Sequence, residues 1–121
     1  MNFVKTAAAV VLSTAALIGG ATPAMADTLV PPYPTVTTWH DVNIRTCSST
    51  STSCPTSGKI LAGNSSLAYC WVYGQTITDF GITNDVWIQV NRKPGAKFFA
   101  SAVYFVGDKY ANLPVKANCT D

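Results

Sequence analysis

Few side chains in this sequence could carry out acid–base or nucleophilic chemistry. Its one histidine, His40, precedes Asp41, there is no glutamate, and the six aspartates are scattered along the chain. A nucleophile–base pair needs a serine or cysteine within hydrogen-bond reach of the histidine, and no motif places one there. A pair of catalytic carboxylates is equally unsupported. We therefore expect that the protein is not an enzyme and interpret His40 as a surface or capping residue.

The cysteines are the other reactive side chains, and they could bind zinc or form disulfides. They are Cys47, Cys54, Cys70 and Cys119. Their spacing lacks the closely spaced pair of a zinc knuckle, so we expect no metal and no other cofactor. An even number of cysteines in a small exported domain indicates two disulfides, for which three pairings exist. Cys47 and Cys54 flank the polar loop CSSTSTSC and could close it, which would leave Cys70 to reach Cys119.

Residues 1–26 have the three parts of a secretory signal peptide. MNFVK carries one positive charge, residues 6–20 form a small and apolar run, and ATPAMA ends in an A-x-A pattern. The apolar run is shorter than the about 20 residues of a membrane-spanning helix. We therefore expect cleavage after Ala26, secretion of a 95-residue mature chain, and no membrane association after cleavage.

The charge of the mature chain is nearly balanced. Without Lys5, seven lysines and arginines stand against six aspartates, a net charge of +1. So small a charge gives no electrostatic reason to expect nucleic acid or an anionic membrane as a partner.

The composition of the mature chain predicts short strands and no helix. Residues 27–40 hold three prolines in four positions and are interpreted as an extended, Pro-rich arm. The remaining residues, 41–121, form short runs of β-type residues between clusters of Gly, Pro, Asn and Ser, which is typical of a small barrel or sandwich. Strands are expected within 41–45, 58–63, 65–74, 84–90 and 96–106, with a hairpin connection at 91–96 and a loop rich in Thr and Gly between 74 and 84.

Aromatic residues recur at every second position around Cys70. Alternate side chains of a strand point to opposite faces, so Tyr69, Trp71 and Tyr73 share a face that Cys70 does not. If Cys70 points inward toward Cys119, this row points outward, and exposed aromatic patches often mark binding sites. The candidate ligand-binding residues are Tyr69, Trp71, Tyr73, Phe80 and Trp87, with Asn43 and Asp79 as possible polar contacts. Burial beneath the arm or a disulfide loop, and self-association, remain the alternatives.

Five features in this order resemble the bacterial SH3-like domain family, in the form found in small exported actinobacterial proteins. They are VNIR, TCSSTSTSC, GNSSLAYCWVYG, the Thr/Gly segment QTITDFGITNDVW, and the final cysteine after LPVKAN. The resemblance spans 41–119 and implies an all-β, SH3-like barrel of five to six short strands. It also implies the disulfides Cys47–Cys54 and Cys70–Cys119. The sequence departs from the family at Lys97, where a glycine is expected.

Members of this family commonly bind cell-wall peptides, so the resemblance implies a secreted, non-catalytic binding module. Its expected partner is a cell-envelope peptide or another extracellular protein. The alternative is a secreted protease inhibitor that presents the loop 54–59, where Cys54 and Pro55 would brace an exposed segment ending at Lys59. Such inhibition depends on a preorganised loop. The oligomeric state is left open.

Overall fold

The computed structural model describes residues 29–93 and 95–119, with the side chains of 92 and 93 excepted, so the expected signal peptide lies outside the described residues. The described part is all-β, as predicted, with no α-helix in it. Its elements are β3 (Thr35–Thr37), β4 (Val42–Arg45), β5 (Thr56–Ile60), β6 (Ser65–Leu67), β7 (Cys70–Asp79), β8 (Ile82–Lys93), β9 (Ala96–Ser101) and the 3-10 helix η2 (Ala102–Tyr104).

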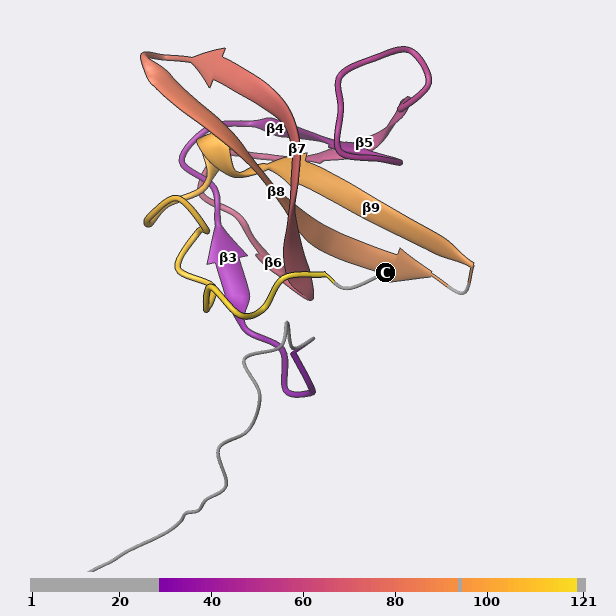
Figure 1. Cartoon of the computed structure of the whole chain (residues 1–121), viewed down its shortest axis with the longest axis vertical. Coiled ribbons are helices and arrows are strands. Elements are labelled where there is room, and N and C mark those ends of the chain that lie inside the picture. Colours follow the sequence, from indigo (N-terminus) through magenta and orange to yellow (C-terminus); the bar gives the residue numbers. More distant parts are fainter. Residues whose placement is uncertain (1–28, 94, 120–121) are drawn as a thin grey trace, which may run out of the picture.

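The strands form two sheets, both antiparallel. The larger has the order β5-β4-β9-β8-β7, and the smaller is the pair β3-β6. The larger sheet is open, because β5 and β7 are its two edges. The seven strands of the described part exceed the five or six expected, since the long run 65–74 is divided between β6 and β7 and the end of the arm is itself a strand. Figure 1 shows the β7–β8 hairpin projecting beyond the remaining strands.

The end of the Pro-rich segment is part of the folded domain. Val36 in β3 is buried, and β3 pairs with β6 through the register Val36↔Ser66. Tyr33 packs edge-to-face on Tyr69 with 4.5 Å between ring centroids. The next residues, 37–39, run beside 104–106 and are held there by backbone hydrogen bonds. This segment therefore positions Trp39 and His40 against the chain that follows β9.

The register between β7 and β8 decides which side chains share a face. Trp71 is opposite Ile88, and Cys70 is opposite Gln89. Directly opposed residues place their side chains on the same face, so the row that contains Trp71 faces the main core together with Ile88. Cys70 lies on the other face, as the alternation predicted. The conditional expectation that Cys70 points into the core and the aromatic row outward was wrong, and the alternative of burial holds for Trp71, which packs in the main core.

Strand β8 is buried on both faces. Five consecutive residues, from Val86 to Val90, are at most 1% exposed. One face packs in the main core, and the other carries Trp87 and Gln89. The Cys47–Cys54 loop lies against β7 at Gly74, where a Cβ would sit 2.5 Å from the carbonyl oxygen of Ser48. Only glycine allows this close approach, and the loop is fixed there by a hydrogen bond from Gln75 N to that oxygen of 3.0 Å.

Both expected disulfides are present and confirm the predicted pairing. Cys47–Cys54 closes a loop with a sequence separation of 7, and Cys70–Cys119 spans a separation of 49. The second bridge ties the C-terminal segment to the start of β7, where Cys119 N also donates to the carbonyl of Trp71 at 2.8 Å. Two disulfides are typical of an oxidising, extracellular environment. Within residues 29–93 and 95–119 there is no helix with the length and hydrophobicity to cross a membrane.

Candidate functional site

The predicted ligand-binding residues do not form one surface. Trp71 and Trp87 are 3% and 1% exposed, so their assignment as ligand contacts was wrong: each fills the core on its own face of the β7–β8 pair. Tyr69 is half-buried beside Tyr33. Tyr73 and Phe80 remain, at 53% and 56% exposed, but they lie in different surroundings.

Phe80 is at the tip of a hairpin that the sequence analysis took for a loop. Strand β7 continues to Asp79 and β8 begins at Ile82, so Phe80 and Gly81 form a two-residue turn. Their φ angles are +51° and +74°, the combination of a type I′ turn, which asparagine and glycine adopt most readily. A phenylalanine in this left-handed region costs about 1 kcal/mol. The turn thus holds an exposed aromatic ring at a strained position.

Two aromatic rings pack against Phe80 and a third packs against those two. We call the four residues the Trp39 cluster: Trp39, His40, Phe80 and Tyr104. Phe80 lies 5.2 Å from Trp39 and 4.7 Å from His40 between ring centroids. Tyr104 lies 5.8 Å from His40. Trp39 is 39% exposed, so the cluster presents two large rings to solvent. The amino-acid sequence alone does not reveal this cluster, because it depends on the pairing of 37–39 with 104–106.

Hydrogen bonds fix the orientation of the cluster. The Trp39 indole N–H donates to the carbonyl of Val103 at 2.9 Å, which sets the plane of that ring. The Tyr104 hydroxyl donates to Asp79 Oδ2 at 2.6 Å, while the backbone N–H of Phe80 donates to Asp79 Oδ1 at 3.0 Å. Asp79, one of the predicted polar contacts, therefore joins the hairpin tip to η2. The other one, Asn43, is exposed in β4 opposite Lys59, away from these contacts.

The Tyr104–Asp79 contact predicts a stability change at high pH. Burial and the hydrogen bond to Asp79 raise the pKa of Tyr104 to about 12, whereas an unfolded tyrosine ionises near about 10. The contribution of this group is complete below pH 10 and is lost as the pH rises through about 12, because the unfolded chain releases the proton first. We expect the difference in Tm between the wild type and Tyr104→Phe to shrink across that window in thermal melts. A constant difference would show that folding does not raise the pKa of Tyr104.

A surface pocket of about 790 Å³ adjoins the Trp39 cluster. Trp39 belongs to both, and the pocket continues between the β7–β8 hairpin and the chain after η2. Its lining combines apolar and polar side chains: Trp39, Thr76, Ile82, Thr83, Asn84, Asp85, Ala102, Val103, Phe105, Val106, Gly107, Asp108 and Lys109. A concave site with apolar walls and a few polar groups is the usual form of a ligand pocket.

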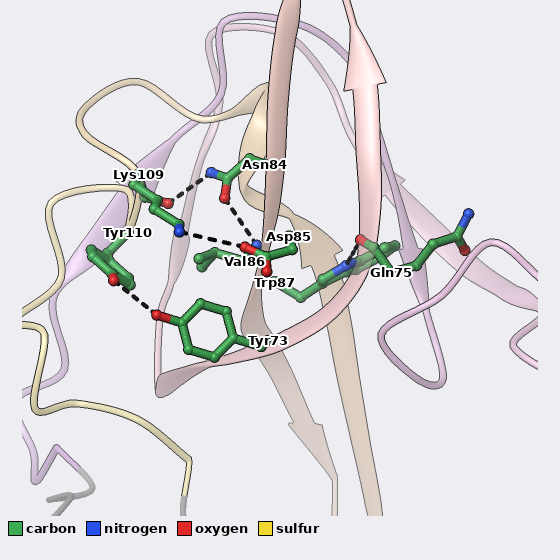
Figure 2. Close-up of polar contacts among 8 residues, drawn as sticks. All are labelled: Tyr73, Gln75, Asn84, Asp85, Val86, Trp87, Lys109 and Tyr110. Carbon is green, nitrogen blue, oxygen red and sulfur yellow. Dashed lines mark hydrogen bonds and ion pairs between the residues drawn. The ribbon is translucent and has the colours of Figure 1, made fainter.

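Polar contacts fix the far wall of the pocket (Figure 2). Asn84 is buried; its amide donates to the carbonyl of Lys109 at 2.8 Å and its oxygen accepts from Val86 N at 3.0 Å. The Lys109 ammonium lies 3.6 Å from Asp85 and 5.3 Å from the Tyr73 ring centroid. Asn84 thus has a structural role, and Asp85 and Lys109 form a pair of opposite charges at this wall, beside Asp108, which also lines the pocket.

Tyr73 meets Tyr110 at the edge of this wall. Their hydroxyl oxygens are 3.0 Å apart, and this hydrogen bond raises the pKa of Tyr73 above its ordinary value. Both rings contact Trp71, with 4.9 Å and 4.6 Å between centroids. The exposed Tyr73 is therefore held against the C-terminal segment.

The residues considered above for catalysis, metal binding and protease inhibition have the following surroundings. His40 Nδ1 lies 2.8 Å from the carbonyl of Asp41; a carbonyl only accepts, so this nitrogen donates, and the ring is held by the backbone. Among the described residues, no three His, Cys, Asp or Glu side chains gather as metal ligands would. The prediction of an exposed loop at 54–59 was wrong, because Thr56–Ile60 is the paired strand β5. The inhibitor hypothesis thereby loses the braced loop on which it depended.

Comparison with known proteins assigns no relative. Neither a family model, nor a curated protein, nor a solved structure matches this chain.

Proposed function

We propose that this protein is a secreted, non-catalytic binding module related to the bacterial SH3-like domains. Its ligand is a cell-envelope peptide or another extracellular protein, held at the pocket beside the Trp39 cluster. The observation that carries the proposal is Phe80: an apolar ring, 56% exposed, at a φ of +51°. Strain of this kind persists where the surroundings enforce it and often accompanies function.

The chemistry of the site suits recognition of a peptide. Trp39 and Phe80 offer flat apolar area with few rotatable bonds, so that little entropy is lost when a ligand covers them. The adjoining pocket adds side chains that can bond to peptide groups, including Thr76 and Thr83. Asp85 and Lys109 provide one charge of each sign at its far wall.

We expect the purified, disulfide-bonded protein to be retained on intact peptidoglycan sacculi, and both Trp39→Ala and Phe80→Asn to lose that retention. Phe80→Asn removes the ring, but asparagine adopts the left-handed turn more readily than phenylalanine. The relief of about 1 kcal/mol of strain therefore offsets the stability lost with the ring contacts, so this variant tests binding without a change in stability. Sedimentation with sacculi measures retention, and urea unfolding confirms that each variant is folded.

Leu61→Ala is the matched control. Leu61 is 52% exposed and apolar, yet it belongs neither to the Trp39 cluster nor to the pocket lining, so retention should be unchanged. Equal retention of the wild type and of Trp39→Ala would place the binding surface elsewhere. If the wild type itself is not retained, the cell-envelope peptide is excluded and extracellular proteins become the partners to test.

A further inference from the structure

Two tyrosines that are distant in sequence meet at their hydroxyl groups. Tyr73 in β7 and Tyr110 in the C-terminal segment are separated by 37 positions, and their hydroxyl oxygens lie 3.0 Å apart (Figure 2). Tyr73 is 53% exposed, so an external reagent can reach it. In each ring the two carbons ortho to the hydroxyl are bonded to the carbon that carries it. Contact between the hydroxyls therefore places these edges of the two rings next to each other, so that a small rotation of the rings can bring ortho carbons together.

The neighbours of this pair hold it in place. Trp71 is buried and contacts both rings, at 4.9 Å from Tyr73 and 4.6 Å from Tyr110. Lys109 lies over both rings, with its ammonium 5.3 Å and 5.9 Å from the centroids, and pairs with Asp85. The two phenols are thus preorganised by a core side chain on one side and a charge cluster on the other, which favours a reaction between them over a reaction between molecules.

We propose that Tyr73 and Tyr110 are an oxidative modification site at which a haem peroxidase, with hydrogen peroxide as the oxidant, forms an intramolecular dityrosine cross-link. Each phenol loses one electron and one proton to become a phenoxyl radical. The two radicals join through a carbon–carbon bond between ortho positions, and the hydrogen on each of these carbons returns to a phenol oxygen as a proton. Hydrogen peroxide takes up the two electrons and two protons and becomes two molecules of water.

The other tyrosines have different neighbours. The Tyr104 hydroxyl donates to Asp79. Tyr33 and Tyr69 are also neighbours, but they meet edge-to-face, with an interplanar angle of 66°. They form an internal comparison, in which two tyrosine rings lie close together with 4.5 Å between their centroids. The two disulfides are typical of the oxidising space in which such a reaction takes place.

The cross-link would add a second covalent tie between β7 and the C-terminal segment, beside the pocket, after the Cys70–Cys119 disulfide. It would close a chain segment of 37 positions in the unfolded state as well as the folded state, and a tie of this kind stabilises in proportion to the lost freedom of the unfolded chain. We expect the modified protein to have a higher Tm. This inference is independent of the proposed binding function.

The test treats dilute, disulfide-bonded protein with a haem peroxidase and hydrogen peroxide. The expected product is a monomer lighter by two hydrogen atoms, with dityrosine fluorescence and a cross-linked peptide joining Tyr73 to Tyr110. Tyr73→Phe and Tyr110→Phe should each abolish that product, while both keep the ring that contacts Trp71, and melting curves verify their folds. Tyr69→Phe should leave the yield unchanged.

Three results would overturn the proposal. They are a cross-link at Tyr33–Tyr69 alone, coupling only between molecules, and an unmodified wild type in a reaction where added free tyrosine is coupled. A reaction in urea with the disulfides reduced adds a further criterion. If the fold brings the phenols together, the 73–110 product disappears there; an undiminished yield would contradict the role of preorganisation.

Discussion

Replacing Cys70 and Cys119 together with alanine is expected to lower the free energy of unfolding by about 4 kcal/mol, against about 2.5 kcal/mol for the same change at Cys47 and Cys54. The difference comes from the length of chain that each bridge closes, with sequence separations of 49 and 7, because a longer closed loop removes more freedom from the unfolded chain. Alanine is the suitable replacement, since Cys70 and Cys54 are buried and a hydroxyl there would lack solvent.

Packing of the C-terminal segment adds to the larger effect. Leu113 and Ala117 are buried in the main core, and Ala117 accepts a hydrogen bond from Trp71 N. Without the Cys70–Cys119 bridge these contacts depend on a free chain end. Urea unfolding of the two double-alanine variants measures both costs, and hydrogen exchange of 105–119 shows where protection is lost. A larger loss for the short bridge would contradict the loop-length argument.

The sequence predicted which side chains share a face but not which face is inside. Alternation placed Trp71 and Cys70 on opposite sides of β7, and the register with β8 confirms it. The choice of the inner face depended on the idea that a disulfide points into the core. In this fold both faces of β8 are covered, so Cys70 is buried without lying in the main core. Composition could not reveal this, because part of that face of β7 is covered at Gly74 by a loop rich in serine and threonine.

The hairpin tip was missed for a local reason. The residues ITDFGITND alternate on both sides of a dipeptide that ends in glycine, which is the pattern of a two-residue hairpin. Phenylalanine at the first turn position hid the pattern, because non-glycine residues seldom adopt a positive φ. The Trp39 cluster was out of reach for a different reason: Trp39 and Tyr104 become neighbours only through the pairing of 37–39 with 104–106.

Burial of the predicted aromatic row changes what mutation of Trp71 should do. As an exposed ligand contact, Trp71 could be truncated without harm to the fold. In the structure it is 3% exposed, contacts Tyr73 and Tyr110, and its indole N–H donates to the carbonyl of Pro114 at 3.1 Å. Removing a buried tryptophan costs about 3–5 kcal/mol, a large part of the about 5–15 kcal/mol that stabilises a domain. We therefore expect Trp71→Ala to be largely unfolded under mild denaturing conditions.

Trp39→Ala is the comparison that makes this test sharp. Both indoles donate one hydrogen bond to a main-chain carbonyl, but Trp39 is 39% exposed, so its truncation removes less buried area and should cost less than half as much. Urea unfolding of the two variants beside the wild type gives both values. Trp71→Ala should lower the midpoint far more than Trp39→Ala, and only Trp39→Ala should yield a folded protein whose binding can be assayed. Equal losses, or a loss below about 1 kcal/mol for Trp71→Ala, would contradict the burial of the row and return Trp71 to the candidate binding surface.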